Sequence, residues 1–248
     1  MKVEIKDYER VDDLHRNGYM LIQDPKRFCF GVDAVLLSGF ATAKKGDKVL
    51  DLGTGTGVIP ILMSAKTKAE HFSALEIQPE SAEMAKRSVM LNDLQDKIDI
   101  IEGDIKKAAE RFKPSSFDVI TTNPPYMNFE GGLKNSYDPK TIARHEVLCS
   151  LDDVAFAAQR LLKFGGKFFM VHRPHRLTDI MCVLREHKLE PKRIRFVQPY
   201  ADREPNMVLV EAVRSGKPMI KFCPFSYFLI RFRRQICPAS ENILRQMK

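Results

Sequence analysis

From residue 48 onward, short runs of β-branched and apolar residues alternate with longer segments whose apolar residues recur every three or four positions. The short runs favour strands and the longer segments favour helices. This alternation predicts an α/β fold with a doubly wound, mainly parallel sheet and right-handed crossovers. The predicted strands are 48–52, 71–77, 97–102, 117–122, 167–172, 192–197 and 207–214, and the predicted helices are 58–66, 79–91, 151–163 and 177–187.

The first 43 residues precede this pattern and predict an N-terminal extension of the same domain. Residues 17–18 form an Asn-Gly turn signal. We expect 19–23 to pair with 27–30 as a hairpin, and a helix to follow over 32–40. The chain contains no internal repeat and no low-complexity linker, which favours one domain over two.

Composition places the chain among ordinary globular proteins, with 248 residues, of which 44% are hydrophobic and 29% are charged. No apolar stretch approaches the roughly 18 residues of a membrane span. The first seven residues lack the apolar core of a signal peptide, so a cytoplasmic location is expected. The five cysteines lack CxxC spacing and the six histidines lack HExxH spacing, so neither a disulfide framework nor a metal site is predicted.

The net charge is +8, and the basic excess is concentrated in two segments, 163–195 and 231–234, whereas 44–122 is nearly balanced. Such segments are typical of a surface for phosphates, and equally of a solvated basic face. The charge is therefore consistent with a polyanionic partner without identifying one.

A glycine-rich segment follows the first strand of the alternating region and reads Asp51-Leu52-Gly53-Thr54-Gly55-Thr56-Gly57. Glycines permit a sharp turn and let a ligand lie against bare backbone. The GxGxG spacing is one residue short of the dinucleotide fingerprint GxGxxG, and a purely structural turn has the same composition. The segment alone is therefore a weak indication of a nucleotide site.

Carboxylates at successive strand ends strengthen this interpretation. Glu76 ends the second strand and Asp104 follows the third. In those places they can accept ribose hydroxyls and an adenine amino group, although Asp104 also suits a helix N-cap. Asp51 suits a cationic cofactor better than a pyrophosphate, which prefers helix N-termini and basic groups. S-adenosylmethionine, with its amino group, sulfonium, ribose and adenine, fits this set of acceptors.

The tetrapeptide Asn123-Pro124-Pro125-Tyr126 directly follows the fourth strand. In doubly wound sheets this place faces the glycine loop across the point where the strand order switches. The prolines fix the backbone and carry no N–H, so the Asn123 oxygen and the Pro124 carbonyl can each accept one N–H of a planar amino group. Tyr126 offers a face for stacking. A rigid Pro-Pro turn explains the prolines but not the remaining residues and their location.

Such a pair of acceptors answers a specific chemical problem. An exocyclic amine donates its lone pair into the ring and is a poor nucleophile. Acceptors off the ring plane favour a tetrahedral nitrogen and localise the lone pair toward a methyl donor. The proton can leave afterwards to water, so no strong general base is required.

With these motifs the chain resembles the class I S-adenosylmethionine-dependent N-methyltransferases. Three further segments, 23–37, 143–146 and 172–177, make it similar to the bacterial valine tRNA (adenine-37-N6)-methyltransferases, from about residue 10 to residue 218. The Asn-Pro-Pro-Tyr motif alone is shared with DNA adenine and protein glutamine methyltransferases.

The resemblance implies a Rossmann-like sheet of seven strands, mainly parallel, with helices on both faces and a reversed last hairpin. Residues 1–43 would form an extension whose hairpin and helix pack over the cofactor site, and 44–218 the methyltransferase domain. Residues 219–248 form a basic and aromatic tail that departs from the short polar ending of the relatives.

The resemblance also assigns roles to individual residues. Those assigned to the methyl donor are Gln23, Phe30, Asp33, Asp51, Gly53, Gly55, Gly57, Glu76, Ile77, Asp104 and Ile105. The catalytic residues would be Asn123, Pro124, Pro125 and Tyr126. Arg144, His145, Arg173 and Arg176 would face RNA, with helix-surface charge as an equal alternative for each.

The activity so predicted is transfer of a methyl group from S-adenosylmethionine to the N6 amine of adenine 37 in a valine tRNA. The expected partner is tRNA, without membrane or metal, and a monomer is favoured. Methylation of a protein glutamine, or of adenine in DNA or rRNA, remains an alternative. A non-catalytic or NAD-type nucleotide-binding protein would keep the glycine loop but would not need residues 123–126.

Overall fold

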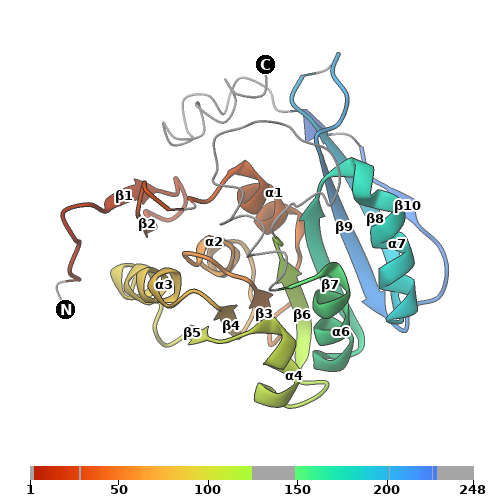
Figure 1. Ribbon diagram of the computed structural model, residues 1–248, viewed down its shortest axis with the longest axis horizontal. Coiled ribbons are helices and arrows are strands. Elements are labelled where there is room, and N and C mark those ends of the chain that lie inside the picture. The colour runs from red at the N-terminus through yellow and green to blue at the C-terminus, as the bar shows by residue number, and fades with distance from the viewer. Residues whose placement is uncertain (1–2, 28, 125–148, 201, 225, 228–248) are drawn as a thin grey trace.

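The computed structural model describes residues 3–27, 29–124, 149–200, 202–224 and 226–227. A central sheet runs through the molecule in the order β10-β8-β9-β7-β6-β3-β4-β5, and β11 also pairs with β8 (Figure 1). Its strands are β3 (Lys48–Leu52), β4 (His71–Glu76), β5 (Ile98–Glu102), β6 (Phe117–Thr122), β7 (Leu162–His172), β8 (Leu189–Gln198), β9 (Met207–Arg214), β10 (Lys221–Phe222) and β11 (Ser226–Tyr227).

The strand order switches at β3. Leu52 lies opposite Leu75 of β4 on one side and opposite Thr122 of β6 on the other, and both pairings are parallel. β9 runs antiparallel to both of its neighbours, β7 and β8. The predicted doubly wound, mainly parallel sheet with a reversed last hairpin is therefore confirmed, and the chain leaves β3 and β6 at the same edge.

Helices cover both faces of the sheet because its strands are apolar on both sides (Figure 1). Val49 and Val119 pack toward one face, whereas Leu50 and Ile120 pack toward the other. The first face is covered by α1 (Val32–Phe40), α2 (Val58–Lys66) and α3 (Pro79–Leu91), and the second by α4 (Ala108–Arg111), α6 (Leu151–Leu161) and α7 (Leu177–Glu186). Among the described helices, none has both the length and the apolar character that crossing a membrane requires.

Three predicted boundaries after β6 were wrong: the end of the helix 151–163, the start of the strand 167–172 and the start of the strand 192–197. The helix expected over 151–163 ends at Leu161, because the buried Leu162 already pairs with Phe117 as the start of β7. Gly165, with φ 75°, lies within this strand. β8 begins at Leu189, three residues before the predicted 192, and tolerates Pro191 at a register shift.

The N-terminal hairpin has a different partner from the one expected. β1 (Arg10–Asp13) pairs antiparallel with β2 (Met20–Gln23), and the turn between them contains Asn17 at φ 53°. The predicted pairing of 19–23 with 27–30 is therefore wrong. The other edge of β2 is occupied by side chains of α3, since Ser88 accepts a hydrogen bond from the Ile22 N–H. A strand cannot pair where those side chains already satisfy the backbone.

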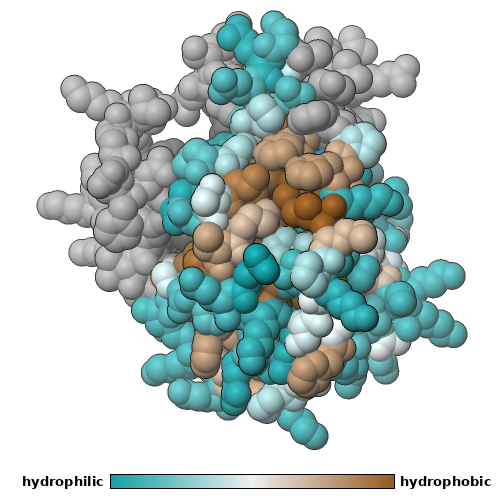
Figure 2. Space-filling view, turned by 90° about the vertical axis from the view of Figure 1, so that its right-hand side faces the viewer, coloured by the Kyte–Doolittle hydropathy of each residue, from teal (hydrophilic) through white to brown (hydrophobic). Residues whose placement is uncertain are grey.

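The start of the C-terminal tail extends the sheet. β10 and β11 both pair in parallel with β8. Figure 2 looks onto this side of the molecule and shows apolar residues gathered among polar ones. The exposed side chains of Met219, Ile220 and Phe222 belong to this part of the chain. The basic segment predicted at 231–234 lies outside the described residues.

Candidate functional site

The glycine loop follows β3 and turns back over the end of β4. Gly53, Gly55 and Gly57 have φ values of 73°, 58° and 87°, a region that residues with a side chain rarely adopt. The N–H groups of Gly53 and Thr54 donate to the Leu75 carbonyl at 2.9 and 3.0 Å. A methyl group placed on Gly55 would have no atom within 4 Å, so open space lies against the backbone there.

Asp51 lies beneath this loop and is 1% exposed. The Thr121 hydroxyl donates to its Oδ1 at 2.6 Å. Burial raises the pKa of Asp51 to about 6, against the effect of the Thr121 hydrogen bond. The Thr54 hydroxyl lies close enough to lower the pKa of Asp51 as well, yet neither this hydroxyl nor the Asp51 Oδ2 has a hydrogen bond of good geometry within the described part of the chain. Buried polar atoms left in this way cost roughly 1–3 kcal/mol each, which a ligand with N–H or O–H donors would recover.

Glu76 ends β4 and is 5% exposed. Its Oε2 accepts from the Gly55 N–H at 2.8 Å, and its Oε1 accepts from the Gln78 N–H at 2.9 Å. These bonds hold the carboxylate beside the glycine loop. A carboxylate oxygen can accept more than one hydrogen bond, so these two bonds do not by themselves prevent binding of a ligand. Ile77, the next residue, is 36% exposed and offers an apolar surface beside the carboxylate.

Asp104 follows β5 and has the capping role that the sequence left open. Its Oδ1 accepts from the Lys106 N–H at 2.9 Å, at the start of a short 3-10 helix, Ile105–Lys107. The half-buried Ile105 reaches the glycine loop, since a methyl group on Gly53 would lie 3.7 Å from its Cδ1. Capping uses one carboxylate oxygen of Asp104, so it does not compete with binding of a ligand by the other.

The residues predicted from the N-terminal extension also have roles within the fold. Gln23 is 1% exposed, accepts from the Phe30 N–H at 2.9 Å through its amide oxygen, and donates to the Asp12 carboxylate. Asp33 accepts from the Ala34 N–H at 2.9 Å in the first turn of α1. Phe30 packs against the core cluster that includes α1 and α2. The hairpin therefore holds the segment that leads into α1.

Asn123 and Pro124 follow β6 directly and are half-buried. Since Thr122 lies opposite Leu52, the register places Asn123 level with Gly53, at the first residue of the glycine loop. The Thr122 hydroxyl donates to the Leu52 carbonyl at 2.9 Å and ties the two strand ends together. Four predicted site residues, Pro125, Tyr126, Arg144 and His145, lie outside the described residues.

The sequence interpretation missed the two threonines that end β6. Thr121 and Thr122 are fully buried, and their hydroxyls bind Asp51 and the Leu52 carbonyl. Two consecutive buried hydroxyl residues at the end of an otherwise apolar strand were the available signal, because such groups need hydrogen-bond partners.

The arginines predicted to face RNA lie after β7 and have partners within the protein. The Arg173 guanidinium donates to the Asn206 carbonyl at 3.1 Å, and Arg176 pairs with Asp179 at 2.7 Å. Other cations of the basic segment 163–195 are also paired, namely Lys163 with Asp118, Arg185 with Glu190, and Arg193 with Glu211. Several of the positive charges in this segment are therefore paired with carboxylates in the folded protein.

His172 ends β7 beside these arginines and is 5% exposed. Burial, with the nearby charge of Arg176, lowers its pKa to about 4. Its Nδ1 accepts from the Arg173 N–H at 2.8 Å. A neutral imidazole that accepts at Nδ1 carries its proton on Nε2, so this edge of the site holds an uncharged ring with a fixed donor.

Comparison with known proteins agrees with this geometry. The model of the methyltransferase small domain family matches residues 31–187, more than half of the chain. A tRNA1(Val) (adenine(37)-N6)-methyltransferase from Porphyromonas gingivalis is 29% identical over 206 residues, covering 81% of this chain and 80% of that protein. A protein of the same name from Histophilus somni is 33% identical and covers 60% of this chain and 62% of its own length.

Solved structures share the fold. A protein described as a predicted O-methyltransferase from Agrobacterium tumefaciens superposes with a TM-score of 0.64 at 20% identity, covering 86% of this chain and 95% of that chain. A geranyl diphosphate C-methyltransferase from Streptomyces coelicolor, solved with S-adenosyl-L-homocysteine, has a TM-score of 0.54 at 13% identity, covering 74% and 80%. At these identities the likeness concerns the arrangement of the sheet and helices.

Proposed function

The chain belongs to the methyltransferase small domain family, and from this premise we propose that it transfers a methyl group from S-adenosylmethionine to N6 of adenine 37 in a valine tRNA. The observation that carries the proposal is the likeness, across about four fifths of the chain, to proteins named for that reaction. The Asn123-Pro124 turn beside the glycine loop supports it, because the reaction needs acceptors for a planar amine at that edge.

The residues at the ends of β3, β4 and β5, called the donor half here, fit S-adenosylmethionine. The unpartnered Asp51 Oδ2 suits the donor's cationic amino group, and the Glu76 carboxylate suits its ribose hydroxyls. Asp104, with Ile77 and Ile105, suits the adenine, since one oxygen can accept its amino group while the apolar side chains contact its ring. When bound, the cofactor supplies an electrophilic methyl group on a sulfonium.

The residues that follow β6 and β7 form the acceptor half, where the methyl group is received. They supply hydrogen-bond acceptors in place of a base. The Asn123 side-chain oxygen and the Pro124 carbonyl each take one N–H of the target amine and favour a tetrahedral nitrogen. Both hydrogen bonds would strengthen as the nitrogen gains the methyl group and a positive charge, while the S–CH3 bond of the donor breaks and its sulfur leaves as a neutral thioether. The amine then loses its extra proton to water. His172 is uncharged above about pH 5 and so places no cation of its own against the developing positive charge.

An adenine in an anticodon loop suits this open edge of the sheet. Loop bases are already exposed, so splaying one into a pocket costs less than extracting it from a duplex. Asn123 and Pro124 would contact only the exocyclic amine of the base. Recognition of a particular tRNA would therefore come from surfaces outside this pocket.

The test is a methylation assay with S-adenosylmethionine carrying a labelled methyl group. The substrates are a valine tRNA transcript, the same transcript with adenine 37 changed to guanine, and total cell protein. We expect N6-methyladenosine in the nuclease digest of the first transcript and no label in the second. Equal labelling of both transcripts would move the target to another adenine. Label found in protein glutamine would replace the tRNA substrate, while the methyl-transfer chemistry would stand.

A further inference from the structure

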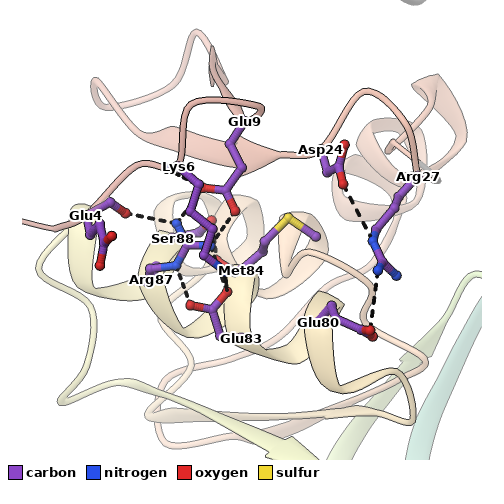
Figure 3. Close-up of polar contacts among 10 residues, drawn as sticks. All are labelled: Glu4, Lys6, Glu9, Asp24, Arg27, Glu80, Glu83, Met84, Arg87 and Ser88. Carbon is purple, nitrogen blue, oxygen red and sulfur yellow. Dashed lines mark hydrogen bonds and ion pairs between the residues drawn. The ribbon is translucent and has the colours of Figure 1, made fainter.

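Arg87 of α3 lies at the centre of an ion-pair network beneath the N-terminal segment (Figure 3). Its side chain is 11% exposed. It binds Glu9 through two nitrogens, both at 2.6 Å, and Glu83 through two nitrogens at 2.6 and 2.7 Å. It also donates to the Glu4 carbonyl at 2.9 Å. Glu9 has a side chain only 1% exposed, so this is a bidentate pair largely shielded from water.

The two acidic partners depend on Arg87. Its hydrogen bonds lower the pKa of both Glu9 and Glu83, against the effect of burial. Removing the guanidinium would leave the Glu9 carboxylate buried without its counter-ion, which is far more unfavourable than loss of an exposed pair. Arg87 therefore fastens residues 4–9 to α3.

Ser88 of α3 and Asn92, the residue that caps its C-terminus, continue the attachment to β2. The Asn92 side chain accepts from the Met20 N–H and donates to the Met20 carbonyl, both at 2.7 Å, and the Ser88 hydroxyl accepts from the Ile22 N–H at 3.0 Å. At the opposite end of the helix, Arg27 lies 3.5 Å from Asp24 and 3.3 Å from Glu80 (Figure 3). Residues 4–27, the N-terminal segment, therefore contact α3 along its length.

The other side of α3 faces the proposed methyl-donor site. A methyl group on Gly57 would lie 3.3 Å from the Ala85 Cβ, so the glycine loop packs directly on α3, two residues from Arg87. The helix also begins at Pro79, directly after Gln78, whose N–H holds Glu76. The helix therefore stands between the N-terminal segment and both parts of the donor site, the loop and the ribose carboxylate.

We propose that Arg87 is a positioning residue for methyl-donor binding: by fastening the N-terminal segment to α3, it holds the glycine loop and Glu76 in their binding geometry. The role rests on the proposed function, because the ligand is taken to be S-adenosylmethionine. Arg87 itself contacts neither the loop nor Glu76 and acts through the placement of the helix.

The test compares Arg87→Ala, Arg87→Lys and a matched control, Lys86→Ala, which removes the same charge from the exposed neighbouring residue. Donor affinity is measured by calorimetry without RNA, well below the melting temperature of each variant. We expect Arg87→Ala to raise the dissociation constant for S-adenosylmethionine by about tenfold, with kcat at saturating donor within about twofold. Lysine keeps the charge but not the fork, so it should be intermediate. The control should bind normally.

A second variant keeps the test decisive if Arg87→Ala does not fold. Glu9→Gln keeps the shape of the partner but removes its charge, and should weaken donor binding in the same direction by a smaller factor. A lowered melting temperature with unchanged donor affinity, in either variant, would overturn the positioning role and leave a structural one. Failure of the unaltered protein to bind S-adenosylmethionine would overturn the proposed function itself, which is a different result from equal binding by all variants.

Discussion

The two halves of the sheet, on either side of β3, are held in different ways. In the donor half, the backbone N–H groups of Gly55 and Gln78 hold the Glu76 carboxylate, and burial raises the pKa of Asp51. In the acceptor half, the contacts join distant segments, such as Arg173 with the Asn206 carbonyl. The donor site is thus built on the ends of two adjacent strands and on the residues that follow them, whereas the acceptor half is assembled from several elements.

This difference predicts separable effects of substitution. A change in the donor half should alter the affinity for S-adenosylmethionine, because in the proposed function these carboxylates bind the methyl donor and not the RNA. A change beside Asn123 should alter turnover, since hydrogen bonds to the amine strengthen as it becomes charged. A substitution that moves both quantities together would break the comparison.

The largest effect is expected for Asn123→Ala. It removes one of two proposed acceptors for the amine, and loss of one preorganised polar group of this type costs about 10²–10³ in turnover. Donor affinity should stay within about threefold, because Asn123 belongs to the acceptor half. The measurement is single-turnover methylation of the valine tRNA transcript beside a donor titration.

Asn123→Asp sharpens the same test. The carboxylate keeps an acceptor of similar shape, and its charge favours a developing ammonium, although it also repels phosphates. We expect partial activity for this variant and almost none for Asn123→Ala. Near-normal turnover in Asn123→Ala would exclude the proposed hydrogen-bonding mechanism.

The second effect concerns Glu76→Ala in the donor half. Loss of this acceptor would leave ribose hydroxyls unpaired at roughly 1–3 kcal/mol, or about tenfold or more in the donor dissociation constant. Glu102→Ala is a matched control, because it removes an exposed glutamate from the end of the neighbouring strand β5. Unchanged affinity in Glu76→Ala would mean that the carboxylate only holds the Gly55 and Gln78 N–H groups.

The donor half was also the more predictable from sequence. The helix bounds 58–66 and 79–91 were predicted correctly, and so was the strand 48–52, because each has a clear apolar period and a turn or proline at its edge. The glycine composition predicted a sharp turn after this strand, and the three glycines form it with positive φ. Local sequence determines these features, so local patterns reveal them.

Features that depend on distant contacts were not predictable in the same way. The backbone groups along one edge of β2 are hydrogen-bonded by Ser88 and Asn92. No pattern within residues 19–30 indicates these contacts, so the sequence paired β2 with the wrong segment. Arg173 was predicted to face RNA, with helix-surface charge as an equal alternative, because its contact with the Asn206 carbonyl, 33 residues away, exists only in the folded chain. A run of basic residues in a sequence gives the sign of the charge but not the contacts that each side chain makes in the folded protein.

A smaller effect is expected from the ionisation of Asp51, whose pKa burial raises to about 6. A cationic donor prefers the ionised carboxylate, so its affinity should rise with pH through this value and level off above about pH 7. If only the ionised form binds, affinity at pH 5 should be about tenfold weaker than at pH 7. Calorimetry in buffers of different ionisation enthalpy should also detect a proton released on binding at the lower pH.

The substitution Thr121→Val tests whether Asp51 is the group that titrates. The Thr121 hydrogen bond lowers the pKa of Asp51, so its loss should move the midpoint of donor affinity to higher pH. The stability of the donor-free protein has the opposite sign. A folded pKa above the unfolded value means that the folded state binds more protons, so unfolding free energy falls as pH rises between about 4 and 6. An affinity profile that ignores Thr121→Val would assign the titration to another group.

The smallest effect is expected in the acceptor half, in the salt dependence of RNA binding. Each phosphate contact contributes about 0.7–0.9 to the slope of log affinity against log salt. Replacing Arg173 and Arg176 together should flatten that slope by about one, since both already have partners within the protein. One unit corresponds to about fourfold in affinity between 50 and 200 mM salt. Arg185→Ala, at the other end of α7, is the control, as its side chain is also paired with a carboxylate.

Asp179→Asn makes the same test in the opposite direction. If Arg176 reaches a phosphate, it must exchange Asp179 for that phosphate, so the carboxylate competes with the RNA. Removing its charge should strengthen RNA binding and steepen the slope, while donor affinity stays unchanged. A flatter slope after Asp179→Asn would show that the pair acts as a unit to hold α7. An unchanged slope in both variants would place the RNA-binding cations elsewhere in the chain.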